Sequence, residues 1–331
     1  MTRLDRTNHA REMFVRHPAN PIITAADLPQ MVNAVFNPAA TIFEGQTLLL
    51  MRVEDRSGLS NLIVARSADG YSDWIVEAER GMFAQTTRFE EYWGIEDPRI
   101  TRVGDEYLIV YTGFSASGPL VLLACTRDFV NFDRRGVLQP PDDKDAALFP
   151  TTFDSRWALV HRPAAQMPGV GTNIWLSWSP DLRHFGDARV VLPARRGGWW
   201  DANKVGLGPP PMLTTEGWLV CYHGVRTTAS GSIYRLGLAL LDRDDPTLLI
   251  ARGNEWVFGP TIDYERTGDV PDVVFPCGWI LEEDGDTVRM YYGAADSVVC
   301  VATASLKALL DHVLKHPADD ISPLHPDQTV I

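Results

Sequence analysis

Apolar positions along the chain fall into short runs of six or fewer residues, each bounded by Gly, Asp, Asn or Pro. Runs of this length between turn-forming residues are typical of β-strands, whereas helices show longer stretches with a spacing of three to four residues. One pattern recurs: an acidic or glycine turn, an apolar strand, and then polar residues. It occurs at EGQTLLLMRVED (44–55), GDEYLIVYTGFS (104–115), DSRWALVHRPAA (154–165), EGWLVCYHGVR (216–226) and GDTVRMYYGAAD (285–296).

A second apolar run follows each of these strands, and equivalent positions repeat at intervals of 50 to 69 residues. The equivalent positions are Leu48, Leu108, Ala158, Leu219 and Val288. Five units of about 60 residues with paired strands predict an all-β, five-bladed β-propeller of four-stranded blades. A pair of β-sandwiches fits five regular units poorly. We expect the first strand of each pair to line the central channel.

Two segments lack this repeat pattern, and we predict that they form short terminal helical extensions. Residues 1–20 have a polarity compatible with a helix, and residues 304–316 (ASLKALLDHVLKH) carry leucines at helical spacing. We therefore expect a single domain over 1–331, with blades from about 20 to 303 and a C-terminal helix at about 304–316. The terminal segments are plausible contacts in a homo-oligomer.

Composition and charge narrow the class of protein. Hydrophobic residues make up 45% and charged residues 22%, which excludes disorder as the main state. No run of 18 apolar residues is present, and the polar start MTRLDRTNHAREMF is not a secretory signal, so we expect a cytoplasmic protein without a membrane span. The net charge of −13 disfavours nucleic acid and anionic membranes as partners.

The four cysteines show no metal-binding spacing, and HExxH and calcium-loop patterns are missing from the sequence, so we expect buried free thiols and no metal site.

Candidate chemistry gathers at the strand ends and in the loops, which a propeller brings together around one mouth of its axis. These candidates include Arg52, Asp55, His161, Arg162, His223 and Asp296 at strand ends, and Asn37, Lys144, Asp145, Lys204, Tyr264 and Glu265 in loops. GIEDPR (94–99) offers a carboxylic acid shielded by neighbouring aromatic residues, which suits a general acid. An ordinary salt-bridged turn is the alternative.

Basic residues from three separate units could form an anion site. His161, Arg162, Lys204 and His223 would supply charge-assisted donors to a phosphate if they cluster, and would be solvated surface charges if they do not. His161–Arg162 and His223 follow equivalent strands, which favours clustering. Trp93 and the Trp199–Trp200 pair lie near these candidates and could stack on sugar rings.

The ordered set FNPAA (36–40), GIEDPR (94–99), HRP (161–163), KVGLGPPP (204–211) and YYGAAD (291–296) resembles glycoside hydrolase family 130. The resemblance extends over residues 20–300 and implies a five-bladed β-propeller. It also implies an inverting phosphorylase of β-1,2- or β-1,4-linked mannosides. Inorganic phosphate would be the cosubstrate, no cofactor would take part, and α-mannose 1-phosphate would be released.

The resemblance also implies residue roles. Asp97 would be the catalytic acid, acting directly or through a sugar hydroxyl. Arg162, Lys204 and His223, with Lys144, would bind phosphate. Asn37, Arg52, Asp55 and Asp296 would hold sugar hydroxyls or orient the acid, and we add His161 and Tyr264 as candidates for substrate binding.

Two alternatives stay open at this point. One is an inverting β-mannosidase in which Glu265, Asp269 or Asp296 activates water. The other is a carbohydrate-binding propeller without activity.

Overall fold

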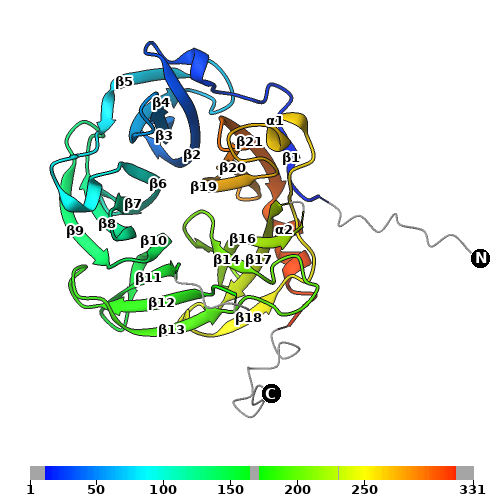
Figure 1. The fold of residues 1–331 in the computed structure, drawn as a ribbon. Helices are drawn as coiled ribbons and strands as arrows, with labels where there is room; N and C mark the ends of the chain where they lie inside the picture. The colour runs from blue at the N-terminus through cyan, green and yellow to red at the C-terminus, as the bar shows by residue number, and fades with distance from the viewer. Residues whose placement is uncertain (1–11, 165–170, 230, 318–331) are drawn as a thin grey trace, which may run out of the picture.

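Five antiparallel sheets stand around a central axis and form a five-bladed β-propeller, which confirms the predicted fold (Figure 1). The computed structural model describes residues 12–164, 171–229 and 231–317. Blade 1 contains β2 (Val32–Phe43), β3 (Gln46–Asp55), β4 (Ser60–Ser67) and β5 (Ile75–Met82). Blade 2 contains β6 (Ile95–Val103), β7 (Glu106–Ser115), β8 (Gly118–Thr126) and β9 (Asp133–Gln139). Blade 3 contains β10 (Asp143–Phe153), β11 (Arg156–Pro163), β12 (Ile174–Ser179) and β13 (Gly186–Leu192).

The remaining two blades are less regular. Blade 4 contains β14 (Lys204–Leu207), β16 (Trp218–Thr228), β17 (Gly231–Leu241) and β18 (Leu249–Arg252), with β15 (Met212–Leu213) beside β16. Blade 5 contains β19 (Val274–Leu281), β20 (Thr287–Ala294), β21 (Val298–Ser305) and β1 (Val15–Arg16). Strand β1 pairs with β21, so the first strand of the described chain completes the last blade.

The expectation that the first strand of each apolar pair lines the channel was wrong. Those pairs are the second and third strands of their blades, and β2, β6, β10, β14 and β19 are the innermost strands (Figure 1). The apolar runs mark middle strands because both of their faces are buried between neighbouring blades. Within β20, for example, Val288 and Met290 pack toward blade 4, whereas Tyr291 packs toward blade 1.

The helices are few and short. They are η1 (Ala25–Asp27), η2 (Phe89–Glu91), α1 (Asp263–Arg266) and α2 (Leu306–Val313). The predicted C-terminal helix is confirmed as α2. Its Ser305 hydroxyl accepts a bond from the Ala308 N–H and caps the helix, and Leu309 and Val313 are buried against the core between blades 4 and 5.

The predicted N-terminal helix is not seen in the part that the structure describes. Residues 15–16 form strand β1 instead, because Val15 and Arg16 pair with Thr303 and Ala302 of β21. Residues 1–11 lie outside the described residues. A buried ion pair reinforces this closure, since the Arg16 Nε lies 2.6 Å from Oε1 of the fully buried Glu265.

All four cysteines are buried free thiols, as the sequence predicted. Burial raises the pKa of Cys221 to about 12, so this thiol is unreactive at neutral pH.

Within residues 12–164, 171–229 and 231–317, every helix is too short or too polar to span a lipid bilayer.

Candidate active site

Three innermost strands carry the same bulge, and each bulge holds one Asn or Asp side chain. Along β2, Phe36 pairs with Arg52 and Ala39 with Leu50, so three steps on β2 match two on β3. The register slips in the same way in β6 and in β10. The first residue within each bulge has a positive φ, at 46° for Asn37, 47° for Asp97 and 52° for Asp145. Asn and Asp tolerate this conformation better than other side chains.

The second strands of three blades carry basic residues at equivalent positions. Arg52 pairs with Phe36, Arg162 with Lys144, and His223 with Gly206 of blade 4. These three residues stand four places after Leu48, Ala158 and Leu219, the equivalent positions of the sequence repeat. The fold therefore brings basic side chains from blades 1, 3 and 4 to one level of the channel.

Asp97 is the centre of the first group of polar side chains. Its Oδ1 accepts hydrogen bonds from Asn37 Nδ2 at 2.9 Å and from Arg52 at 3.3 Å. Its Oδ2 lies 3.5 Å from Lys144 Nζ. Arg99 donates to the Asp97 backbone carbonyl at 2.9 Å and fixes the bulge from below. The Asp97 side chain is almost fully buried and is held on three sides.

The charges around Asp97 set its acidity. Burial raises the pKa of Asp97, but Lys144, Arg52 and Arg99 outweigh burial, so the pKa lies below the usual range. Two nearby carboxyls behave in the opposite way. Burial raises the pKa of Glu96, and burial followed by repulsion from Asp97 raises the pKa of Asp296 to about 6.

Asp145 is the centre of a second group, at the bulge of blade 3. The Arg162 guanidinium makes two contacts of 2.8 Å to Asp145 Oδ2, and His223 Nε2 lies 3.5 Å from the same oxygen. Arg99 approaches the other oxygen at 3.8 Å. Burial raises the pKa of Asp145, but Arg162, Lys144, His223 and Arg99 hold it far below the usual range.

His223 and Lys204 complete the basic side of the channel. The His223 ring packs against Phe275 with ring centroids 4.8 Å apart, and burial lowers its pKa well below the usual value. Its Nδ1 is buried and has no partner among the described residues. Lys204 Nζ donates to the Tyr234 hydroxyl at 2.8 Å. A side chain at Gly206 would overlap both Asp145 and His223, so this position of β14 requires glycine.

Lys144 lies between the group of side chains around Asp97 and the group around Asp145. The acidic sequence around it, PDDKDAALFP, also allows Lys144 to pair with Asp143 or Asp145, and the structure places its ammonium 3.5 Å from Asp97 Oδ2. Burial lowers the pKa of Lys144, but Asp145, Asp97 and Glu96 outweigh burial and raise it. Lys144 is therefore a cation between two carboxylates.

Three candidate residues are placed away from these groups. Asp55 accepts bonds from Ser57 and Leu59 within its own turn. The His161 Nδ1 lies 2.6 Å from Asp143, and its Nε2 lies 2.7 Å from Ser177, so both nitrogens are occupied inside blade 3. Tyr264 packs against the core between blades 4 and 5.

Tyr234 was not identified from the sequence, whereas Glu96 and Arg99 were noted as members of GIEDPR, with Arg99 as a group that could hold a carboxylate in place. Asp145 was noted only as a loop candidate and as a possible partner for Lys144. Glu96 accepts a bond from Arg52 at 3.0 Å, and Arg99 reaches the carbonyls of Leu207 and Gly208 across the channel. No local sequence pattern marks Asp145 as the bulge residue equivalent to Asn37. The described residues contain no group of three or more His, Cys, Asp or Glu side chains arranged to hold a metal.

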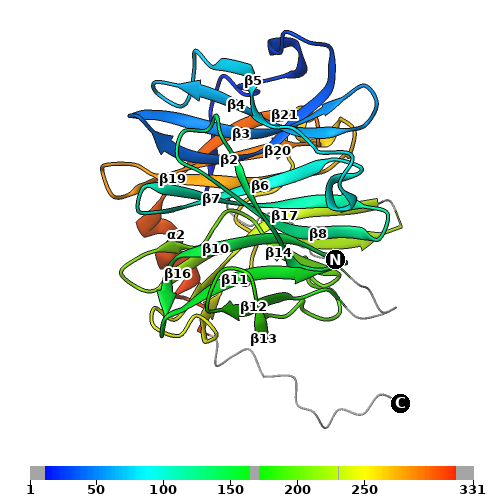
Figure 2. The same cartoon turned by 90° about the vertical axis from the view of Figure 1, so that its left-hand side faces the viewer.

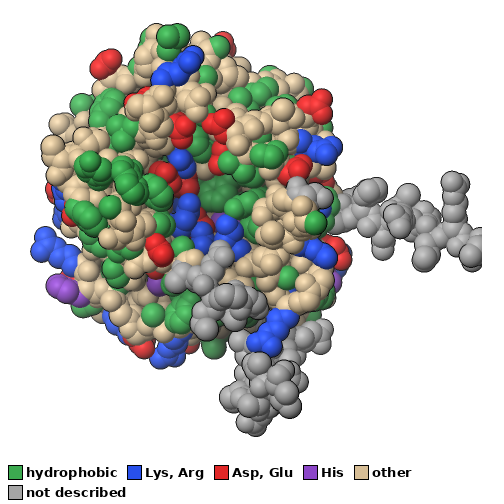
Figure 3. Space-filling view, viewed as in Figure 1, with side chains coloured by type: hydrophobic (Ala, Val, Ile, Leu, Met, Phe, Trp, Pro, Cys, Tyr) green, Lys and Arg blue, Asp and Glu red, His purple; other side chains and the backbone are tan. Residues whose placement is uncertain are grey.

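The two groups give the mouth of the channel two electrostatic sides. Figure 3 shows Asp and Glu side chains along the upper rim of the central hollow and Lys and Arg side chains along its lower rim. One side offers a buried carboxyl with hydrogen-bond donors beside it, and the other offers charge-assisted donors for a compact anion. Such an arrangement can give a proton to a leaving group and hold an anion at the same time.

Comparisons with known proteins identify the chain at the level of its family. The profile of glycoside hydrolase family 130, described as β-1,4-mannooligosaccharide phosphorylase, matches residues 5–315. The β-1,2-mannobiose phosphorylase of Listeria innocua is 38% identical over 77% of this chain and 69% of its own length. The β-1,4-mannooligosaccharide phosphorylase of Ruminococcus albus is 30% identical over 94% of both chains.

Solved structures agree with the sequence relatives. The Listeria innocua β-1,2-mannobiose phosphorylase in complex with β-1,2-mannobiose superimposes with a TM-score of 0.81, at 31% identity, over 91% of this chain and 99% of the other. A further structure, described in terms of family members that are hydrolases targeting β-1,2-mannosidic linkages, gives a TM-score of 0.77 at 25% identity. It covers 91% of this chain and 96% of the other. With the family profile spanning nearly every described residue, this chain belongs to glycoside hydrolase family 130.

Proposed function

We propose that this protein cleaves a β-mannoside with inorganic phosphate, inverts the anomeric centre and releases α-mannose 1-phosphate. One observation carries the proposal: Arg162, Lys204, His223 and Lys144 surround the same channel mouth as the buried Asp97. The ammonium of Lys144 is only 3.5 Å from the Asp97 carboxylate. The phosphorylase names of the relatives support the same reaction.

The proposed chemistry follows from the two sides of the site. Phosphate held by Arg162, Lys204 and His223 attacks C1 of the mannosyl unit from the face opposite the leaving group. Asp97 gives its proton to the departing oxygen. Phosphate is already an anion and needs no base to activate it, so a single carboxyl suffices where an inverting hydrolase uses two.

The low pKa of Asp97 in the free protein fits an ordered reaction. A general acid must carry its proton when the bond breaks. A phosphate that binds beside Lys144 offsets the positive charge that lowers the pKa of Asp97, so phosphate binding raises this pKa. In this proposal phosphate binding allows Asp97 to take up a proton from solvent before the glycosidic bond breaks. Asn37 and Arg52 then orient the Asp97 carboxyl toward the leaving oxygen.

Inorganic phosphate is the sole cosubstrate in the proposed reaction, without a metal or an organic cofactor. We place the reaction in the cytoplasm, because four buried free thiols suit a reducing compartment. There, mannose 1-phosphate conserves the energy of the glycosidic bond.

Synthesis in reverse tests the proposal. The protein is incubated with α-mannose 1-phosphate and mannose, glucose, N-acetylglucosamine or mannobiose as acceptors, and phosphate release is followed. Acceptor-dependent release is expected, and product analysis then identifies the linkage. Cleavage of β-mannosides without phosphate, together with no release from any acceptor, would favour the hydrolase. A lack of activity in both assays would favour a carbohydrate-binding protein.

A further inference from the structure

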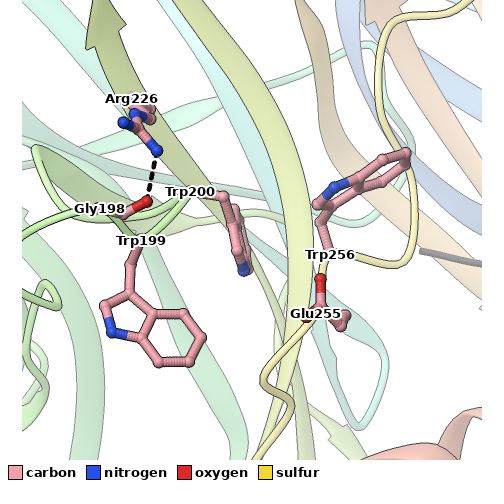
Figure 4. Close-up of a pocket in the computed structure, with 6 residues that line it drawn as sticks. All are labelled: Gly198, Trp199, Trp200, Arg226, Glu255 and Trp256. Carbon is pink, nitrogen blue, oxygen red and sulfur yellow. Dashed lines mark hydrogen bonds between the residues drawn. The ribbon is translucent and has the colours of Figure 1, made fainter. Parts of the chain in front are cut away.

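A cavity of about 370 Å³ lies over blade 4, apart from the channel (Figure 4). Its lining consists of Gly198, Trp199, Trp200, Arg226, Glu255 and Trp256. Arg226 stands three residues after His223 on β16, so the cavity opens on the same face of the propeller as the active site. Trp200 touches Gly237, and Arg235 lies over the ring of Trp256, which places the cavity above β16 and β17 rather than on the axis.

The walls of this cavity are fixed before any ligand arrives. Apart from Arg226 of β16, the lining residues belong to two loops, 193–203 and 253–262, that are held together by several hydrogen bonds. Arg195 of the first loop donates to the Gly253 carbonyl at 2.9 Å and to Asn254 Oδ1 at 3.1 Å. The Trp200 indole donates to the Asn254 carbonyl at 2.9 Å. A preformed site loses little conformational entropy on binding.

Trp200 is held especially firmly. Its ring stacks on Tyr222 at an angle of 22°, with ring centroids 5.7 Å apart. Gly224 and Gly237 make room for it, because a side chain at either position would overlap the indole. Below it, Asp201 accepts bonds from Tyr222 and Arg252 in a buried network. The floor of the cavity is therefore rigid.

Trp200 lies between Trp199 and Trp256 in the lining of the cavity (Figure 4). Trp199 is 41% exposed although the Arg195 guanidinium lies 4.4 Å from its ring centroid, and Trp256 is half-buried. Among the described residues, neither the Trp199 nor the Trp256 indole N–H has a hydrogen-bond partner. Partly exposed indoles held in a rigid cavity offer flat apolar surfaces and two free donors to a ligand.

The lining also offers polar groups to a ligand. Arg226 supplies a positive charge and already donates to the Gly198 carbonyl, and the exposed Glu255 supplies a negative charge and acceptor oxygens. The guanidinium groups of Arg195 and Arg235 are occupied against the rings of Trp199 and Trp256. A donor, an acceptor and aromatic faces match the hydroxyl edge and the apolar face of a hexose ring.

We propose that this cavity is a second carbohydrate site, which binds a sugar ring of a β-mannosyl oligosaccharide away from the active site. The choice of a β-mannosyl ligand rests on the proposed function, whereas the sugar class rests on the cavity itself. The affinity expected for a single ring at such an open site is in the millimolar range, about 1–10 mM.

Fluorine NMR of the full-length chain tests this site directly. Asp97→Asn protein labelled with 5-fluorotryptophan is titrated with β-1,2- or β-1,4-mannotriose in phosphate-free buffer, and the Trp199 and Trp256 resonances are assigned with single Trp→Phe variants. Both resonances should shift saturably. In Trp256→Ala, and more weakly in Glu255→Gln, the response of the Trp199 resonance should be reduced or lost. Trp93→Ala removes an indole of similar exposure (47%) elsewhere and should leave the response unchanged.

Two results would overturn the proposal. One is the lack of any saturable shift of the Trp199 and Trp256 resonances in the folded Asp97→Asn protein. The other is a shift that depends on protein concentration without sugar, which would mean that a second copy of the chain covers the cavity. The measurement needs no turnover, so it remains informative even if reverse synthesis fails.

Discussion

Blades 2 and 3 hold carboxylates at the same backbone position, and the two carboxylates have different surroundings. Asp97 and Asp145 both lie in the bulge of an innermost strand and share a positive φ. Asp97 lies near the Asn37 amide, near Lys144, Arg52 and Arg99, and near two further acids, Glu96 and Asp296. Asp145 instead contacts Arg162, Arg99 and the His223 imidazole. The same backbone geometry therefore places two carboxyls in two different electrostatic environments.

The largest effect is expected from Asp97→Asn. An amide keeps the shape of the side chain but carries no proton to donate, so kcat should fall by about 10²–10⁴-fold. The free energy of unfolding should change little, since Glu96 and Asp296 still balance Arg52 and Lys144. Initial rates in both directions and a denaturant titration check this. Near wild-type rates would remove Asp97 from the role of acid.

Asp145→Asn should instead affect mainly stability rather than kcat. It leaves Arg162, His223 and Arg99 without their buried counter-charge, so the free energy of unfolding should fall by about 3–5 kcal/mol.

This loss should depend on pH. A carboxyl with a lowered pKa in the folded state stabilises above its unfolded pKa, and that contribution disappears as the pH falls. The difference between wild type and variant should therefore shrink below about pH 4. A constant difference from pH 3 to pH 7 would contradict the assignment.

Arg162→Ala tests whether the blade 3 side holds phosphate. Loss of a charge-assisted pair should raise the KM for phosphate by about 10–100-fold while changing the KM for the mannoside less. Arg162→Lys keeps the charge but loses the forked geometry, so its KM for phosphate should lie between those of the wild type and Arg162→Ala. If the phosphate KM stays unchanged in folded Arg162→Ala, Arg162 is not part of the anion site.

The pKa of Asp296 provides a test of the electrostatic surroundings of Asp97. Its pKa is raised to about 6 by burial and by Asp97, so the folded state keeps this proton at a pH where the unfolded chain has lost it. Asp296 therefore lowers stability progressively as the pH rises from about 4 through 6. Relative to Asp296→Asn, wild-type protein should lose stability over this interval. If stability changes equally with pH in the two proteins, the pKa of Asp296 is not raised in the folded state.

Asp55→Ala should have the smallest effect. The Asp55 carboxylate accepts bonds inside its own turn, so we expect a loss of about 1 kcal/mol in stability and an unchanged KM for the mannoside. Steady-state kinetics at saturating phosphate measure this. A marked rise in the mannoside KM would return Asp55 to the site.

The five-fold repeat could be predicted from the sequence because the second and third strands are apolar on both faces. The innermost strands could not be recognised from the apolar pattern, because they are interrupted by bulges, proline and glycine, as in FNPAA and KVGL. Their site residues were therefore found through the family resemblance rather than through periodicity. The role of Asp145 depends on basic side chains from blades 2, 3 and 4, and no local sequence pattern predicts such a group.

Strand alternation explains two of the misplaced candidates. Neighbouring residues of a strand point to opposite faces, so His161 and Arg162 cannot both face the channel. Arg162 does so, and His161 points into the blade. By the same rule, Glu54 and not Asp55 shares the face of Arg52, and their side chains lie 3.8 Å apart. Tyr264 lies on the short helix α1, where no strand rule applies.

The pairing of β1 with β21 has a consequence for synthesis on the ribosome. Val15 leaves the exit tunnel early, but its partner Thr303 is translated 288 residues later. At about 5–20 residues per second, that delay is roughly 15–60 s. During this time the growing chain carries an unpaired edge, and the ring cannot close until the last blade has emerged. The propeller therefore completes its architecture only when β21 has been translated and pairs with β1.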